Sequence, residues 1–104
     1  MPLDLSEIDA AIHAPARLAI MALLASGDEL DFVRLRERLG LTDGNLASHL
    51  RRLEEAGYVE CTKGFAGRRP RTAYRILPRG RQAFERHVAS LERILRAAPG
   101  EPPH

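Results

Sequence analysis

The first half of the chain is a series of segments in which apolar residues recur at helical spacing. Leu5, Ile8 and Ile12 predict a short N-terminal helix. The segment 16–26 is apolar on nearly all sides, and Pro15 suits the first turn of a helix, where its missing N–H costs nothing. We therefore expect a second helix over 16–26 that lies at the centre of the core.

A third helix is predicted over about 31–39. Asp31 can accept hydrogen bonds from the unpaired N–H groups of the first turn, so it serves as the cap. Val33, Leu35 and Leu39 are the apolar residues that we expect to face the core. The charged residues between them are expected to be solvated.

A fourth helix is predicted over about 43–56, with Thr42 as its N-cap and Gly57 after its last turn. Its apolar residues form one stripe at spacings of four and three: Leu46, Leu50 and Leu53. A short turn that contains Gly40 joins it to the helix over 31–39. Two helices joined in this way have the helix-turn-helix signature.

The pattern then changes from helical spacing to strand formers. Residues 58–63 and 72–77 predict two strands, and the intervening 64–71 contains two glycines and a proline, so it is expected to be a long loop. These segments predict a β-hairpin with a long basic tip. A brief extended segment is also expected near 29–32.

Pro78 ends the second strand and opens a last helix, predicted over about 79–97. Its apolar residues form a two-heptad seam that predicts a dimer interface. An alternative is that the seam packs on its own domain. The residues proposed for the dimer interface, including three from the N-terminal segment, are Phe84, Val88, Leu91, Leu95, Leu5, Ile8 and Ile12.

The length of 104 residues fits one domain, which we place at 1–98, with a flexible tail over 99–104. No apolar run is long enough to span a bilayer, and the acidic N-terminus is unlike a signal peptide, so we expect a cytoplasmic protein without a membrane partner. The single cysteine, Cys61, excludes an internal disulfide and a multi-cysteine zinc site, and it is interpreted as a small buried residue.

Charge is distributed unevenly along the chain. Residues 1–62 carry 6 basic and 11 acidic side chains, whereas residues 63–104 carry 10 basic and 3 acidic ones. This asymmetry indicates that the second half contains an element that faces a polyanion.

Three runs resemble parts of a known family. The run 13–24 resembles the Pro-x-Arg-Leu-x-Ile-x-x-Leu-Leu opening of ArsR- and MarR-type bacterial regulators. The run 41–59 is similar to their recognition helix and strand entry, and 67–75 resembles the wing of a small MarR-like subfamily. The resemblance covers about residues 6–97. It implies a mainly α, winged helix-turn-helix fold (α+β) with a C-terminal dimerisation helix, and a homodimeric regulator of transcription that binds double-stranded DNA.

In such a fold the polar face of the helix over 43–56 would enter the major groove, which is about 12 Å wide. Asn45 can pair with adenine, Ser48 can bond to several bases, and Gly44 lets the backbone approach a phosphate. The complete set expected to contact DNA from this helix is Thr42, Gly44, Asn45, Ser48, His49, Arg51 and Arg52.

The hairpin supplies a second predicted contact, with the minor groove or the backbone. Between residues 63 and 75 the sequence has five basic side chains and no acidic one: Lys63, Arg68, Arg69, Arg71 and Arg75. Cations on a hairpin tip suit the negative potential of a narrow minor groove. An amphipathic apolar partner for a lipid surface is missing here.

The sequence offers little support for other classes of function. No catalytic constellation, metal-ligand spacing or phosphate-binding glycine loop is present, so we expect no enzyme, no metal and no cofactor. The main alternative is a winged helix that binds another protein without reading DNA. The hairpin lacks the stacking aromatics that an RNA-binding surface would use. The sequence does not identify a small-molecule effector.

Overall fold

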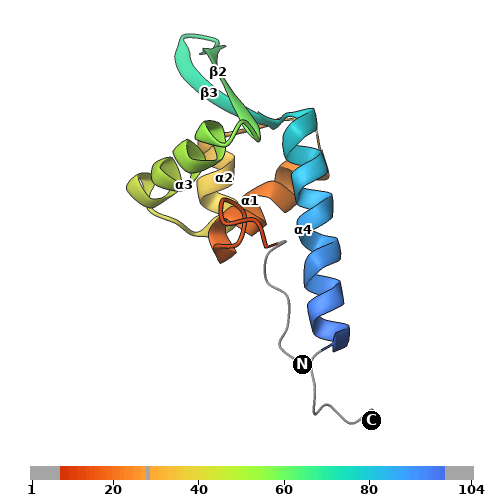
Figure 1. The fold of residues 1–104 in the computed structure, drawn as a ribbon. Helices are drawn as coiled ribbons and strands as arrows, with labels where there is room; N and C mark the ends of the chain where they lie inside the picture. The colour runs from red at the N-terminus through yellow and green to blue at the C-terminus, as the bar shows by residue number, and fades with distance from the viewer. Residues whose placement is uncertain (1–7, 28, 98–104) are drawn as a thin grey trace.

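The computed structural model describes residues 8–27 and 29–97. Helices α1, α2 and α3 pack together, a small sheet covers them, and α4 lies along one side (Figure 1). The order of these four helices and the hairpin along the chain is the predicted one. In chain order the elements are α1 (Pro15–Ala25), β1 (Glu29–Asp31), α2 (Phe32–Leu39), α3 (Asp43–Glu55), β2 (Val59–Ala66), β3 (Arg69–Ile76) and α4 (Pro78–Ala97).

The N-terminal helix is not found in the described residues that precede α1. Residues 8–13 form bends and a single turn, in which the N–H groups of Ile12 and His13 both donate to the carbonyl of Asp9. Ala14 is extended (ψ 136°) because it precedes Pro15, and this conformation stops a helix from continuing through it. The helical spacing of Ile8 and Ile12 therefore reflects one turn rather than a helix.

The two helices of the helix-turn-helix begin and end as their caps predict. The Asp31 side chain accepts from the N–H of Arg34, and Thr42 Oγ1 accepts from the N–H of Asn45. Gly40 ends α2 in the left-handed conformation, at φ 64°. The prediction that Val33 faces the core is wrong, because this side chain is 48% exposed. Phe32 packs on the core in its place, because α2 begins at Phe32 and the next residue is turned by about 100°.

The sheet has the strand order β1-β3-β2, and both pairings are antiparallel. The predicted loop over 64–71 is wrong: β2 and β3 stay paired as far as Ala66 and Arg69. Gly67, at φ 66°, begins a two-residue tip, as a tight hairpin turn requires. Pro70 is tolerated because β1 pairs with β3 only at residues 73–75, so the distal part of β3 has a free edge.

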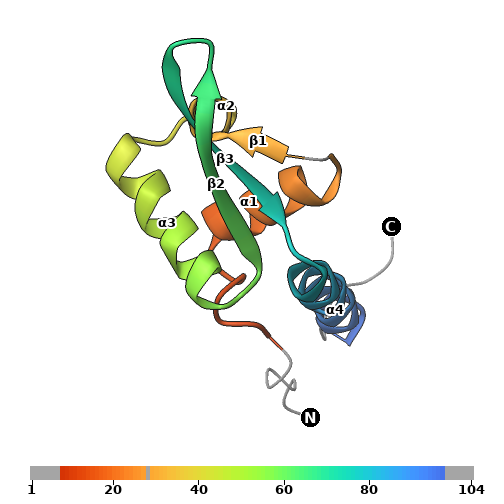
Figure 2. The ribbon, with the colours of Figure 1, turned by 90° about the horizontal axis from the view of Figure 1, so that it is seen from above.

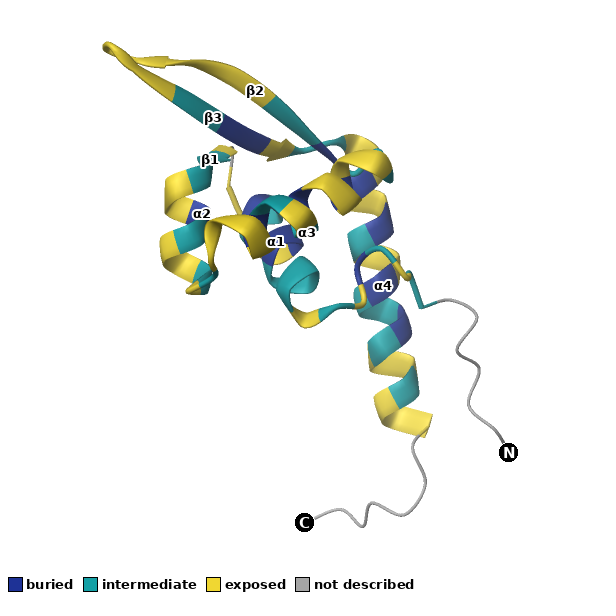
Figure 3. Cartoon of the chain, turned by 90° about the vertical axis from the view of Figure 1, so that its left-hand side faces the viewer, coloured by how far each residue is buried: buried dark blue, intermediate teal, exposed yellow. Residues whose placement is uncertain are grey.

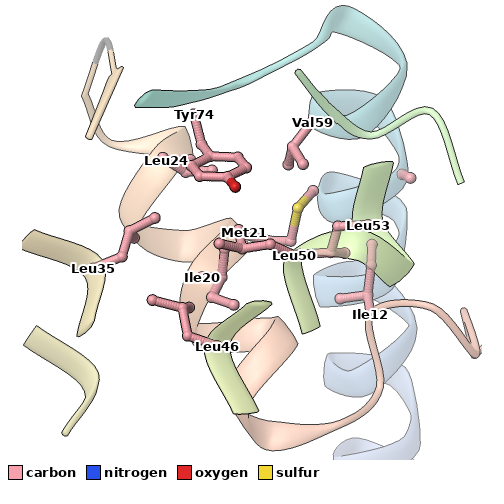
Figure 4. Close-up of a cluster of buried hydrophobic side chains, with 11 residues drawn as sticks. Ile12, Ile20, Met21, Leu24, Leu35, Leu46, Leu50, Leu53, Val59 and Tyr74 are labelled. Carbon is pink, nitrogen blue, oxygen red and sulfur yellow. The ribbon is translucent and has the colours of Figure 1, made fainter. Parts of the chain in front are cut away.

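The core lies between α1, α3 and the base of the hairpin. Its largest side chains include Ile20, Met21, Leu24, Leu50 and Tyr74 (Figure 4). One face of α4 closes this core, and the rest of the helix is half-exposed or exposed (Figure 3). The distal half of the hairpin is exposed as it extends beyond the helices. We call residues 59–76 the wing.

Candidate nucleic-acid interface

Helix α3 separates its apolar and polar residues onto opposite sides. The predicted stripe of three leucines is fully buried and fixes the orientation of the helix. The side opposite to the stripe is open to solvent, and Figure 2 shows α3 at the edge of the molecule beside the wing. This side carries five exposed residues that were predicted to contact DNA, Gly44, Asn45, Ser48, Arg51 and Arg52, together with the acidic Glu55 in the last turn, and Thr42 is exposed at the cap.

An acidic residue at the start of α3 is neutralised by the preceding helix. Asp43 Oδ1 lies 2.7 Å from Nη1 of Arg36, and this ion pair raises the pKa of Arg36. Asp43 would otherwise repel a phosphate at this end of the helix. The free N–H groups and the dipole of the α3 N-terminus favour an anion at the same place.

His49 differs from the other predicted residues of α3 because it is half-buried and has a protein partner. Its Nδ1 lies 3.2 Å from Nη1 of Arg17. A guanidinium has no acceptor, so Nδ1 accepts this hydrogen bond and the proton of the neutral ring is on Nε2. Arg17 Nε also donates to the carbonyl of Ala11, at 2.6 Å. Arg17 therefore ties α3 to the N-terminal turn.

The wing cations fall into two groups. Arg71 forms ion pairs with Glu29 (3.1 Å) and Asp31 (3.4 Å), and Arg75 forms one with Glu60 (2.9 Å). The sequence shows no acid between residues 63 and 75, but the sheet brings acids from β1 and β2 beside β3. The other three cations are exposed and have no ion pair within the described ranges: Lys63, Arg68 and Arg69.

The residues predicted to form a dimer interface are also divided by the structure. Ile12 is fully buried in the core, so it offers no surface to a second copy, and Leu5 lies outside the described residues. Ile8 is half-buried. On α4, the face buried against the chain's own core is formed by Gly80, Ala83, His87 and Ser90. The predicted seam runs beside that face: Phe84, Val88 and Leu91 are half-buried, and Leu95 is 75% exposed.

Metal-ligating side chains do not gather in the part of the chain that the structure describes. Residues 8–27 and 29–97 contain no group of three or more such side chains placed to hold an ion. Within the same ranges, no helix has the length and apolar character needed to cross a bilayer.

The fold and the exposed polar helix beside a cationic wing define a class of protein. A family model described as a winged helix DNA-binding domain matches residues 16–95, and the chain belongs to this family. The predicted winged-helix fold and the resemblance to transcriptional regulators are thereby confirmed.

The chain is also similar to individual proteins, one known by sequence and two by structure. The chain is 43% identical, over 76 residues, to Uncharacterized protein MJ0432 of Methanocaldococcus jannaschii, a match that covers 73% of this chain and 83% of that protein. It is similar to a solved transcriptional regulator homologue from Pyrococcus horikoshii OT3, with a TM-score of 0.80 and 34% identity over 86% of this chain and 89% of that one. A solved structure described as a MarR-family regulator from Enterococcus faecalis V583 gives a TM-score of 0.67 and 26% identity, over 84% of this chain and 77% of that one.

Several residues that shape this surface could not be identified from the sequence. Arg36 and Arg17 carry no local signal, because their partners are 7 and 32 residues away and depend on how the helices pack. Phe65 falls in the segment interpreted as a loop, where its side chain has no predicted direction. A strand extended through Ala66 would have placed Phe65, by period-two alternation, on the same face as Val59 and Lys63.

Proposed function

We propose that the chain is a homodimer that binds specific sequences in double-stranded DNA and so regulates transcription. In this proposal α3 lies in the major groove, and the wing contacts the adjacent minor groove or the backbone. The observation that carries it is the group of unpaired cations on the wing beside the exposed polar face of α3. The family relationship supports DNA as the partner.

The distribution of ion pairs favours particular residues. Arg51 and Arg52 on α3 are exposed and have no ion pair within the described part of the chain, like Lys63, Arg68 and Arg69. These cations can neutralise phosphates without first breaking an ion pair with a carboxylate of the protein. Arg71 and Arg75 must exchange existing partners, so we propose that they contribute less. Asn45 and Ser48 are exposed side chains of α3 that can read base edges.

Helix α4 supports the dimer part of the proposal. Leu95 and the half-buried Val88 and Leu91 continue an apolar line along a helix that extends beyond the body of the molecule (Figure 1). A second copy that covered this line would produce two α3 helices related by a twofold axis. Half-sites in the DNA would then lie about 34–36 Å apart, one helical turn.

The test measures affinity against salt concentration, on duplexes selected from a random pool and on unselected duplexes. Replacing both Arg68 and Arg69 with Ala should reduce affinity for both kinds of duplex. It should also flatten the slope of log affinity against log salt by about 0.9 for each phosphate that is no longer neutralised. The matched control replaces Arg71 and Arg75, which carry the same charge on the same wing but are ion-paired. Its slope should change less.

The part of α3 in the same experiment is tested by Asn45→Ala and Ser48→Ala. Each should reduce affinity for selected duplexes more than for unselected ones, because removing a base-reading side chain leaves the phosphate contacts intact. An unchanged salt slope in the Arg68/Arg69 variant would remove the wing from the proposed mechanism. If no duplex is bound and the protein captures no sequence from the pool, the DNA-binding proposal is wrong.

A further inference from the structure

The wing has one face that changes character along its length. Side chains alternate across a strand, so Val59, Cys61, Lys63 and Phe65 of β2 point to the same side. At the base this face packs on the helices, and Val59 is 3% exposed. Farther out the wing has passed the helices, and Phe65 is 74% exposed on the same face.

Phe65 lies beside one apolar residue but remains largely exposed to solvent. Pro70 lies directly opposite in the register of β2 and β3, and it is also exposed. Cross-strand neighbours on one face are close enough for their side chains to touch. The distal wing therefore presents a ring and a proline together to solvent, two residue types that proteins insert between base pairs from the minor groove.

The surroundings of this apolar pair are cationic and concave. Lys63 precedes Phe65 on the same face, and the unpaired Arg68 and Arg69 follow at the tip. A cavity of about 620 Å³ opens between the distal wing and the start of α2. Pro70 belongs to its lining and Phe65 does not, and the other lining residues include the apolar Phe32 and Val33, the basic Lys63 and Arg69, and the acidic Asp31.

These charges decide between possible partners for the face. A second copy of the wing would bring Lys63 of this face, and the two unpaired arginines at the tip, close to identical cations, so the face does not suit self-association. A polyanion with an apolar interior satisfies both the cations and the ring. Double-stranded DNA has this combination, with phosphates along its edges and stacked bases between them.

We propose that Phe65 acts as a wedge in the minor groove next to the α3 site. Its ring enters a base step and partly unstacks it, Pro70 packs against the adjoining sugar, and Lys63, Arg68 and Arg69 hold the flanking phosphates. This inference rests on the proposed function and adds a determinant of specificity to it. Pyrimidine–purine steps such as TA unstack most easily, so they are preferred under the wing, and the bound duplex is bent.

The test uses duplexes that carry one selected site and differ only in the step beneath the wing, TA or GG. Dyes at the two ends report bending by energy transfer, and anisotropy reports affinity. For the wild type, the TA duplex should bend more and bind more tightly. Phe65→Ala should reduce affinity for the TA duplex by about tenfold, the scale of one aromatic ring stacked on a base, and should abolish the bend. Phe65→Leu, which keeps an apolar wedge, should preserve most of the bend.

Thr62→Ala is the matched control, because it truncates another exposed side chain of β2, one that alternation places on the opposite face of the wing from Phe65. It should leave bending and step preference unchanged. Equal loss of affinity on the TA and GG duplexes by Phe65→Ala, with the bend retained, would overturn the wedge while leaving DNA binding intact. A wild-type protein that binds neither duplex would instead refute the proposed function itself.

Discussion

Gly80 permits a close approach between the start of α4 and Tyr58, the residue before β2. A Cβ at this position would overlap the carbonyl oxygen of Tyr58. The backbone of Tyr58 cannot easily move, because its N–H donates to the carbonyl of Leu53 at 3.0 Å and its carbonyl accepts from the N–H of Leu77 at 2.9 Å. A residue without a side chain is therefore required where α4 begins.

We expect Gly80→Ala to lower the free energy of unfolding by about 1–3 kcal/mol, the usual cost of forcing extra atoms into a packed site. Gly44→Ala is the control: a Cβ there meets no atom within 4 Å, and Gly44 lies in α3. Alanine favours helix, so this variant should gain up to about 1 kcal/mol. Urea denaturation of both variants makes the comparison. Equal midpoints for the two would show that the contact with Tyr58 does not constrain the fold.

At the scale of elements, α4 has two adjacent stripes of residues that differ in burial. One stripe, which includes Ala83 and His87, is buried against the chain's own core. The neighbouring stripe, which ends at Leu95, is only partly covered. The spacing of apolar residues identified the second stripe because it contains larger side chains. The buried stripe was missed because it consists of small or polar residues.

The proposed dimer predicts the behaviour of Leu95→Glu. Leu95 is 75% exposed in the single chain, so the substitution should leave folding unchanged but place a charge in the contact between copies. In analytical ultracentrifugation at micromolar concentration, the wild type should have about twice the chain mass of 11.6 kDa, and the variant should dissociate at concentrations at least about tenfold higher. Gln82→Glu, an exposed change on the same helix, should remain dimeric. A wild-type mass of one chain would contradict the dimer.

The elements also show what the sequence could predict. Helices α2 and α3 were placed well, because their caps at Asp31 and Thr42 are local signals read within three residues. The ion pairs of Arg71 could not be predicted, because Glu29 is 42 residues away and meets it only through the pairing of β1 with β3. The exposed face of α3 followed from its buried leucines, whereas the division of the wing cations depended on tertiary structure.

At the scale of the whole molecule, a buried histidine in the middle of α4 bonds to the N-terminal turn. His87 on α4 is 1% exposed, and its Nδ1 accepts from the N–H of Asp9 at 3.3 Å. Nε2 has no partner among the described residues. Asp9 is held further by the hydroxyl of Tyr58, which donates to Oδ2 at 2.5 Å. Hydrogen bonds thus fix the N-terminal turn to α4 and to Tyr58, the residue that precedes the wing.

This arrangement predicts that stability falls in mild acid. Burial, and secondarily the nearby His13, lower the pKa of His87 below the ordinary value of 6.5. The unfolded chain therefore binds the proton more readily than the folded one, so the contribution of His87 is complete above about pH 6.5 and is lost as the pH falls below it. His87→Gln, which keeps an acceptor but does not titrate, should flatten this part of the pH profile of urea midpoints.

His13→Gln is the control for that profile, because His13 is an exposed residue whose ring centroid lies 5.9 Å from that of His87. This variant should keep most of the decline in acid. A wild-type profile that is flat between about pH 7 and pH 5 would show that protonation of His87 is not linked to folding.

The short tip of the wing affects how much conformational entropy the wing would lose on binding. Residues 64–66 and 69–71 are already ordered by strand pairing in the free chain. A flexible loop of the same length would lose conformational entropy on association, about 1–2 kcal/mol for each residue fixed. The wing is pre-organised, so little of the energy of its contacts is spent on ordering the segment that makes them.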